Sequence, residues 1–209
     1  MTLFDDRADA GRKLAERIGC EPLSPDGVVY GIPRGGVVVA AEVARALHLP
    51  LDVVVPAKVG APGNPEYAIG AVAPDGEVVA NPEAGFSAEE VARLAGPARE
   101  KIARSLALFR PGGATADARG HHAIVVDDGL ATGLTAIAAC SFLRRAGASR
   151  ITLAVPVASP RAVRALAPHA DEIIVLEAPH SFASVGQFYR RFGQTSDAEV
   201  IELLNRSAD

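Results

Sequence analysis

The sequence predicts an α/β fold with an open, mainly parallel sheet flanked by helices. Short apolar runs rich in β-branched residues alternate with amphipathic helical patterns, and each run ends in turn or loop residues. At 209 residues and 49% hydrophobic content, the chain can bury one full core. We therefore expect a single domain over residues 1–209, with a core of about five strands at roughly 24–177. Ligands of such sheets bind outside the carboxyl ends of the strands.

The most informative segment is IVVDDGLATGLT, residues 124–135. A buried strand is expected at Ala123–Val126, and a helical pattern covers residues 133–146. The small-residue loop between them offers backbone amides, threonine hydroxyls and a helix N-terminus to a phosphate. Asp127 and Asp128 can accept hydrogen bonds from ribose hydroxyls or approach a bound cation. The segment therefore favours a ribose 5-phosphate as ligand.

The alternative for these carboxylates is an N-cap. Asp5–Asp6, ahead of the Ala/Leu-rich stretch to Ile18, are expected to be one. Asp127 and Asp128 lie further upstream of their helix than capping requires, so we favour the binding interpretation.

A second strand-loop-helix unit lies nearer the N-terminus. Val28–Ile32 is expected to be a strand, Pro33-Arg34-Gly35-Gly36 a turn, and Val37–Leu47 a helix. The glycines allow close approach of backbone amides to an anion, and the Arg34 guanidinium suits phosphate oxygens. Ordinary turn chemistry is an equal alternative when this segment is taken alone.

A lid is predicted at residues 58–80. Leu51–Ala57 is expected to be a strand that ends at Lys58, and residues 59–67 lack periodicity, which predicts a mobile loop. A β-hairpin around the turn at residues 74–76 should follow. Lys58 is a candidate for pyrophosphate contact or a solvated lysine, and Glu66 and Tyr67 are weaker candidates for acceptor contact.

The rest of the chain continues the βα alternation. Strands are expected at Ile151–Val155 and Glu172–Leu176, with a helix at Pro160–Ala167 between them. A helical insert at residues 87–110 begins with a capping pattern at its first residue and breaks at Gly96-Pro97. Its role stays open, and residues 111–120 form a Gly/Ala-rich connector.

A possible hood segment covers residues 178–209. Phe182, Phe188 and Tyr189 can stack on a nucleobase, and Gln187 can hydrogen-bond its edge. Packing onto the core is the simpler explanation of these aromatic residues, and the residues alone favour it.

Composition excludes several other classes of function. The net charge of −4 and the pI near 5.8 give no basic surface for nucleic acid, and no apolar run reaches membrane length. Cys20 and Cys140 are isolated, which favours a reducing cytoplasm. The histidines lack zinc-site spacing, and His121-His122 is expected at a surface turn.

The phosphate segment resembles the ribose-phosphate-binding motif of type I phosphoribosyltransferases, and DDGLATG is especially similar to adenine phosphoribosyltransferases. The chain as a whole is similar to a group of phosphoribosyltransferases with unassigned acceptor. On this resemblance, Asp127 and Asp128 bind the ribose hydroxyls of phosphoribosyl pyrophosphate (PRPP), and Arg34, Gly35 and Gly36 bind its pyrophosphate. Asp127, Asp128 and Lys58 are the candidate catalytic residues. The expected ligands of its 5-phosphate are Gly129, Leu130, Ala131, Thr132, Gly133, Leu134 and Thr135.

The resemblance implies transfer of 5-phosphoribosyl from PRPP to a nitrogenous acceptor, a nucleobase by preference, with release of pyrophosphate. Mg²⁺ is expected to be carried by PRPP near Asp127 or Asp128, with no dedicated metal site on the protein. Ala131 stands where hypoxanthine-guanine enzymes carry an aspartate base, so an oxopurine acceptor is disfavoured. Acceptor and oligomeric state stay open, a homo-oligomer included.

Two alternatives use the same residues. One is a non-catalytic PRPP- or nucleotide-sensing regulatory protein on the same fold, since fold does not settle function. The other is hydrolysis or phosphorolysis of a nucleotide. The lid and the pyrophosphate loop favour transfer from PRPP, because a plain ribose phosphate needs neither.

Overall fold

The computed structural model describes residues 3–20, 26–110 and 117–206. Most of the predicted connector at 111–120 therefore lies outside the described residues. The strands form two sheets. The parallel sheet has the order β2-β1-β6-β7-β8 and contains β1 (Gly27–Gly31), β2 (Leu51–Val53), β6 (His122–Val126), β7 (Arg150–Val157) and β8 (Glu172–Glu177). The antiparallel sheet contains β3 (Ala57–Ala61), β4 (Asn64–Val72) and β5 (Val78–Ala80).

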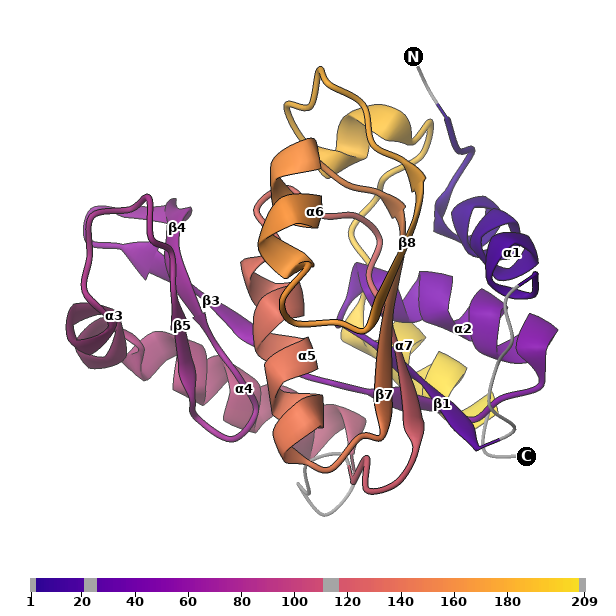
Figure 1. Ribbon diagram of the computed structural model, residues 1–209, viewed down its shortest axis with the longest axis horizontal. Helices are drawn as coiled ribbons and strands as arrows, with labels where there is room; N and C mark the ends of the chain where they lie inside the picture. The colour runs from indigo at the N-terminus through magenta and orange to yellow at the C-terminus, as the bar shows by residue number, and fades with distance from the viewer. Residues whose placement is uncertain (1–2, 21–25, 111–116, 207–209) are drawn as a thin grey trace.

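Helices cover both faces of the parallel sheet (Figure 1). α1 (Arg7–Ile18) and α2 (Gly35–Leu47) pack on one face, and α5 (Leu134–Arg145) and α6 (Pro160–Leu166) on the other. Ile124 of β6 faces α1 and α2, whereas its neighbour Val125 faces α5, as the two-residue period of a strand requires. The predicted α/β class and parallel sheet are confirmed.

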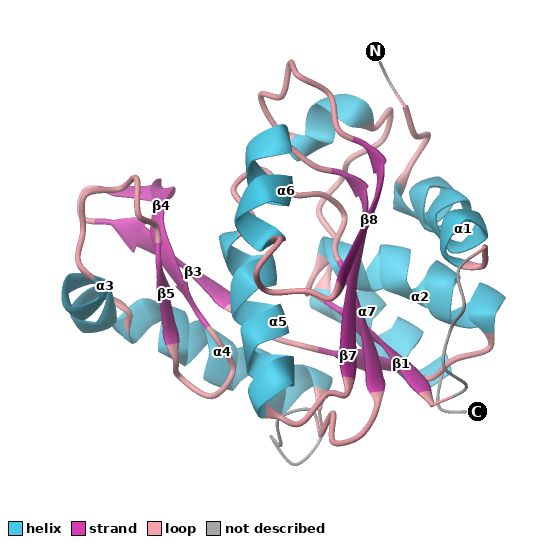
Figure 2. Cartoon of the chain, in the orientation of Figure 1, coloured by secondary structure: helices cyan, strands magenta, loops and turns pink. Residues whose placement is uncertain are grey.

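The antiparallel sheet builds a separate layer beside the parallel one, seen to the left in Figure 2. α3 (Ala88–Leu94) and α4 (Gly96–Phe109) pack against it around a hydrophobic cluster of their own. Ser87 and Glu90 form the predicted capping box, and the insert divides at Ala95, immediately before the predicted break at Gly96-Pro97. Among the described helices, none has the length and apolar character needed to cross a membrane.

The prediction of one strand over Leu51–Ala57 is wrong. β2 ends at Val53, and the chain leaves the parallel sheet before β3 starts at Ala57. Pro56 in between has no N–H for a ladder hydrogen bond. Lys58 therefore lies inside a strand of the antiparallel sheet, and not at the carboxyl end of a parallel strand.

The prediction of a mobile loop at residues 59–67 is also wrong. Most of this stretch belongs to the β3–β4 hairpin, which turns at Gly63 with φ of 74°. The register shifts on both sides of Gly60. Such a bulge breaks the alternation of polar and apolar residues that reveals a strand in a sequence. The predicted hairpin at residues 68–80 is present as β4 and β5.

Smaller differences concern element ends. α2 starts at Gly35, two residues before the predicted Val37. His122 is a buried residue of β6 and not part of a surface turn. Part of the predicted hood segment forms α7 (Asp197–Arg206), which packs against α2 and α4. A short 3₁₀ helix, η1 (Val185–Phe188), lies in the earlier part.

Candidate active site

The loop from β6 to α5 leaves its backbone amides open. The N–H of Leu130 donates to the Val157 carbonyl at 2.9 Å and ties the loop to β7. Gly133 has φ of 78°, a left-handed conformation that glycine adopts without strain. Within the described residues, no backbone N–H of 131–135 donates to a protein acceptor. These donors gather at the N-terminus of α5, where the helix dipole adds positive potential, so the loop suits a phosphate.

The two predicted binding loops lie directly against each other. β1 and β6 are adjacent parallel strands, so the loops that follow them emerge side by side. A Cβ atom on Gly36 would lie 2.8 Å from Asp127 Oδ1, and one on Gly35 would overlap the Asp128 carboxylate. Only glycine fits at both positions. The two loops that the resemblance assigns to one PRPP site are therefore in contact, and the binding of pyrophosphate by Gly35 and Gly36 stays a prediction.

The aspartate pair is partly buried and electrostatically strained. Burial, and then the neighbouring charge of Asp128, raise the pKa of Asp127 well above its usual value. Burial also raises the pKa of Asp128, while the Arg7 guanidinium opposes that rise. Asp127 Oδ1 accepts a hydrogen bond from the Asp128 N–H at 2.8 Å. A pair in this state gains from hydroxyl donors or a cation brought by a ligand.

Arg7 is a site residue that sequence reasoning missed. Its Nε donates to Asp128 Oδ2 at 2.7 Å, and the two residues are 121 positions apart in the chain. Tyr189 adds a second contact to the same residue, since its hydroxyl donates to the Asp128 carbonyl at 2.5 Å. No sequence signal at Arg7 pointed to this role, because the contact exists only in the folded chain.

Arg34 lies on the side of its loop that faces α4 and α7. Its Nη1 is 3.5 Å from Asp197 Oδ1, and both side chains are about half exposed. A cavity of about 360 Å³ opens here, with basic side chains from the helical insert on its wall. The lining residues are Pro33, Arg34, Val55, Pro56, Lys101, Arg104, Ser105, Leu108 and Asp197. The sequence did not single out Lys101 and Arg104, because nothing predicted that α4 would meet the Arg34 loop.

The candidates on the predicted lid lie together on the β3–β4 hairpin. Lys58 Nζ donates to the Glu66 carbonyl at 3.1 Å and lies 3.3 Å from its carboxylate. Tyr67 is 47% exposed on β4. Among the described residues, Lys58 has no contact with the aspartate pair. The structure therefore groups these residues with each other and apart from the two binding loops.

The aromatic residues of the predicted hood divide into two kinds. Phe188 and Tyr189 are buried in a small cluster with Phe4, so the core-packing explanation is correct for them. Phe182 is partly exposed, with its ring centroid 5.2 Å from that of Phe188. Gln187 is exposed and donates to the Ser181 carbonyl at 3.2 Å. Phe182 and Gln187 stay available to a ligand, whereas Phe188 and Tyr189 do not.

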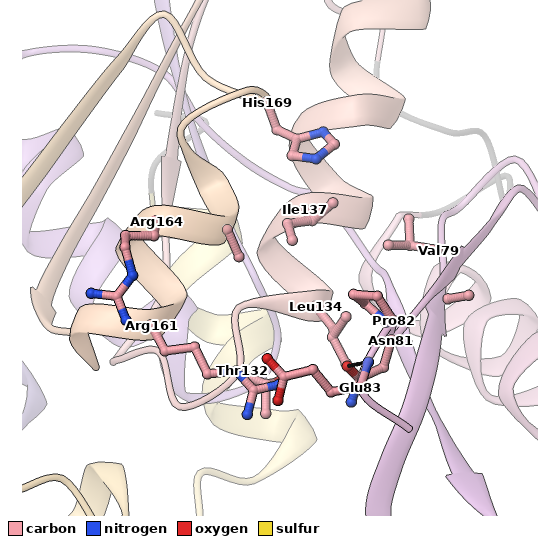
Figure 3. A pocket seen from close by; sticks show the side chains of 12 residues that line it. Val79, Asn81, Pro82, Glu83, Thr132, Leu134, Ile137, Arg161, Arg164 and His169 are labelled. Carbon is pink, nitrogen blue, oxygen red and sulfur yellow. Dashed lines mark hydrogen bonds and ion pairs between the residues drawn. The ribbon is translucent and has the colours of Figure 1, made fainter. Parts of the chain in front are cut away.

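A further cavity, of about 540 Å³, lies beside the phosphate loop between β5, α5 and α6 (Figure 3). Thr132 and Leu134 are the only predicted site residues that line it, and its wall is mostly apolar. Arg161 and Glu83 point toward each other across it and form an ion pair at 2.8 Å. Neither the aspartate pair nor Arg34 contributes to this cavity.

Among the residues described, no three His, Cys, Asp or Glu side chains are grouped to hold a metal ion. Asp127 and Asp128 nevertheless carry the oxygen donors that Mg²⁺ prefers. Two carboxylates leave most of an octahedral shell to other oxygens. The site therefore fits a Mg²⁺ ion that arrives with a polyphosphate ligand.

Comparison with known proteins gives the family. Residues 3–189 match the sequence profile of the phosphoribosyl transferase domain. The chain belongs to this phosphoribosyltransferase family. It is 45% identical to Mycobacterium tuberculosis proteins of strains H37Rv and CDC 1551 that carry a provisional phosphoribosyl transferase name, over 99% of this chain and 47% of those proteins. This phosphoribosyltransferase domain thus spans about half the length of those relatives.

Two solved structures match almost the full length of this chain. The protein TT1426 from Thermus thermophilus is 43% identical, with a TM-score of 0.80 and coverage of 98% of this chain and 99% of that chain. A Neisseria gonorrhoeae protein, solved with bound ppGpp, is 15% identical with a TM-score of 0.53, and the match covers 98% of this chain and 94% of that chain. The second likeness shows the fold alone.

Proposed function

We propose that the protein transfers the 5-phosphoribosyl group of PRPP to a nitrogenous acceptor, a nucleobase by preference, and releases pyrophosphate. One observation carries the proposal. The open amides of residues 131–135, the carboxylates of Asp127 and Asp128, and the Gly35-Gly36 backbone meet at adjacent strand ends. Phosphate, ribose diol and pyrophosphate are the ligand groups that suit these three parts.

The reaction is a displacement at the anomeric carbon. The lone pair of an acceptor nitrogen forms the new C–N bond, and the C–O bond to pyrophosphate breaks with its electron pair leaving on oxygen. In this proposal the loop 131–135 holds the 5-phosphate, and Asp127 and Asp128 orient the ribose and favour the positive charge that develops on it. Arg34 accommodates the departing pyrophosphate. Positioning and electrostatic complementarity supply most of the rate increase.

Magnesium is proposed as the cofactor. Asp127 and Asp128 would hold the ion together with PRPP oxygens. Mg²⁺ supplies charge neutralisation of the pyrophosphate leaving group when it is bound. Lys101 and Arg104 lie on the wall of the cavity next to Arg34 and add cations on the pyrophosphate side. The proposed location is a reducing cytoplasm, since Cys20 and Cys140 are both free.

The test is an incubation of the protein with PRPP and Mg²⁺ against purines, pyrimidines and nicotinate, with pyrophosphate release and calorimetric PRPP binding measured in parallel. Release that depends on one base supports the transferase and names its acceptor. Tight PRPP binding without release for any base supports the regulatory alternative. The binding panel includes ppGpp, since a protein of the same fold binds it. Release of pyrophosphate with water alone identifies a hydrolase.

A further inference from the structure

Arg7, the first residue of α1, is held in place by three contacts. Its Nε donates to Asp128 Oδ2 at 2.7 Å, and its Nη1 donates to the Gly193 carbonyl at 2.7 Å. Its guanidinium carbon lies 3.9 Å from the centroid of the Phe192 ring. The Arg7 side chain thus joins the N-terminal helix, the end of β6 and the segment after η1.

This ion pair differs from its neighbours in burial. The side chains of Arg7 and Asp128 are 13% and 15% exposed, whereas those of Arg190 and Asp5 nearby are 74% and 61% exposed. Exposed pairs contribute little because solvent screens them. A pair this buried, with the arginine fixed at its other nitrogen and on its face, sets the orientation of the carboxylate.

The contacts of Asp128 fix one of its two carboxylate oxygens, Oδ2, and leave Oδ1 without a partner side chain in the described part of the chain. Arg7 occupies Oδ2, and the Gly35 backbone packs against the same oxygen. The Tyr189 hydroxyl holds the backbone carbonyl of Asp128. Among the described residues, no other residue donates a hydrogen bond to Oδ1 of Asp128. The Asp128 carboxylate is therefore fixed through Oδ2, and Oδ1 remains able to accept a hydrogen bond from a ligand.

We propose that Arg7 is a positioning residue, which orients the Asp128 carboxylate so that its open oxygen receives a ribose hydroxyl. This inference rests on the proposed function. It adds to the ribose site Arg7 and, behind it, Phe192 and Gly193, which are all far from Asp128 in the sequence. In this proposal Arg7 acts through Asp128, and the loop at residues 131–135 holds the 5-phosphate.

The opposite possibility is a latch, in which Arg7 competes with ribose for Asp128. The positioning role and the latch role predict opposite changes in affinity when Arg7 is removed. Removal of a positioning residue weakens the binding of ligands that carry ribose, whereas removal of a latch strengthens it.

The experiment compares wild type with Arg7→Gln, Arg7→Lys and the control Arg12→Gln, which removes an exposed arginine of the same helix. Calorimetry measures the binding of PRPP in the presence of Mg²⁺ and, separately, of ribose 5-phosphate. Ligand-observed NMR measures the binding of glycerol 3-phosphate, a phosphate ester without a ribose ring. We expect Arg7→Gln to lower the affinity for PRPP and for ribose 5-phosphate by about tenfold, as for loss of a charged hydrogen bond. The affinity for glycerol 3-phosphate should be unchanged. Arg7→Lys should restore part of the affinity, and Arg12→Gln should match wild type.

Tighter ribose 5-phosphate binding by Arg7→Gln would overturn the proposal in favour of a latch. Equal weakening of all three ligands would show a merely structural role and overturn it as well. Phe192→Leu, which removes the ring under the guanidinium and leaves Arg7 in place, should give an intermediate loss and serves if Arg7→Gln fails to fold. Absence of PRPP binding by wild type would instead overturn the proposed function itself.

Discussion

At the scale of single residues, the two binding loops of the site pack so closely that only small residues fit at their contact. Gly35 and Gly36 allow the backbone of one loop to touch the carboxylates of the other. Asp127 and Asp128 stay in a setting that disfavours their charge, since burial raises the pKa of both. Residues that are costly for the fold and specific in geometry are typical of binding sites.

Asp128→Asn should lower PRPP affinity by about tenfold or more, because the amide is a weaker acceptor than a carboxylate and loses the charge that pairs with Arg7. Turnover should fall with it, and the melting temperature should stay within a few degrees of wild type. Calorimetry and circular dichroism measure the two effects. Unchanged affinity and kinetics in a folded variant would contradict the assignment of Asp128 to the ribose.

Gly35→Ala should abolish PRPP binding. Its Cβ atom would lie 2.6 Å from Arg7 Nε and overlap the Asp128 carboxylate, so the Asp128 and Arg7 side chains must leave their positions. Overpacking of this kind costs about 1–3 kcal/mol of unfolding free energy, which denaturant melts can measure. Gly96→Ala is the matched control, because no atom within 4 Å meets its Cβ. Wild-type affinity in Gly35→Ala would contradict the packing described for these loops.

At the scale of elements, the strands β1, β6, β7 and β8 were predictable, whereas the end of β2 and the β3–β4 hairpin were not. The strands at β1, β6, β7 and β8 have apolar, β-branched sequences because both faces of the sheet are covered. The β3–β4 hairpin carries a bulge at Gly60 and a proline at residue 65, which remove the alternating pattern. α7 was absent from the predictions, although its contacts with α2 and α4 place it near Arg34.

The phosphate loop gives a prediction at this scale. Because the amides of residues 131–135 have no protein acceptor in the described structure, they should exchange rapidly with solvent deuterium. Addition of PRPP and Mg²⁺ should slow their exchange, while β6, already hydrogen-bonded to β1 and β7, should change little. Hydrogen exchange with mass spectrometry measures both. Protection that appears in β3 and β4 and spares the loop would argue against phosphate binding here.

At the scale of the whole molecule, the aspartate pair links binding to stability. The folded pKa of Asp127 is raised above its unfolded value, so the native state binds its proton more tightly than the unfolded chain does. Stability therefore falls as pH rises from the unfolded to the folded pKa, and the loss is complete above the folded pKa. At neutral pH and without ligand, the Asp127 carboxylate therefore lowers the stability of the folded protein.

Asp127→Asn should raise the melting temperature at pH 7 and have little effect near pH 3, where the aspartate is protonated in both states. Asn keeps an oxygen that can accept the Asp128 N–H, so the local hydrogen bond survives. PRPP affinity should fall in the same variant. Melting curves across pH measure the effect, with the exposed Glu77→Gln as a control for general charge removal. A lower melting temperature at neutral pH would contradict the strained state of Asp127.

The sequence by itself determined the α/β class, the βα alternation of the parallel sheet, and the loops that carry the aspartate pair and Gly35-Gly36. These features are local: each depends on the period of a short segment and on glycine, aspartate or threonine at its end. Only the tertiary structure decided that Arg7 and Tyr189 hold Asp128, that Lys58 pairs with Glu66 inside a hairpin, and that Arg34 meets α4 and α7. Such contacts join segments far apart in the chain, and no periodicity records them.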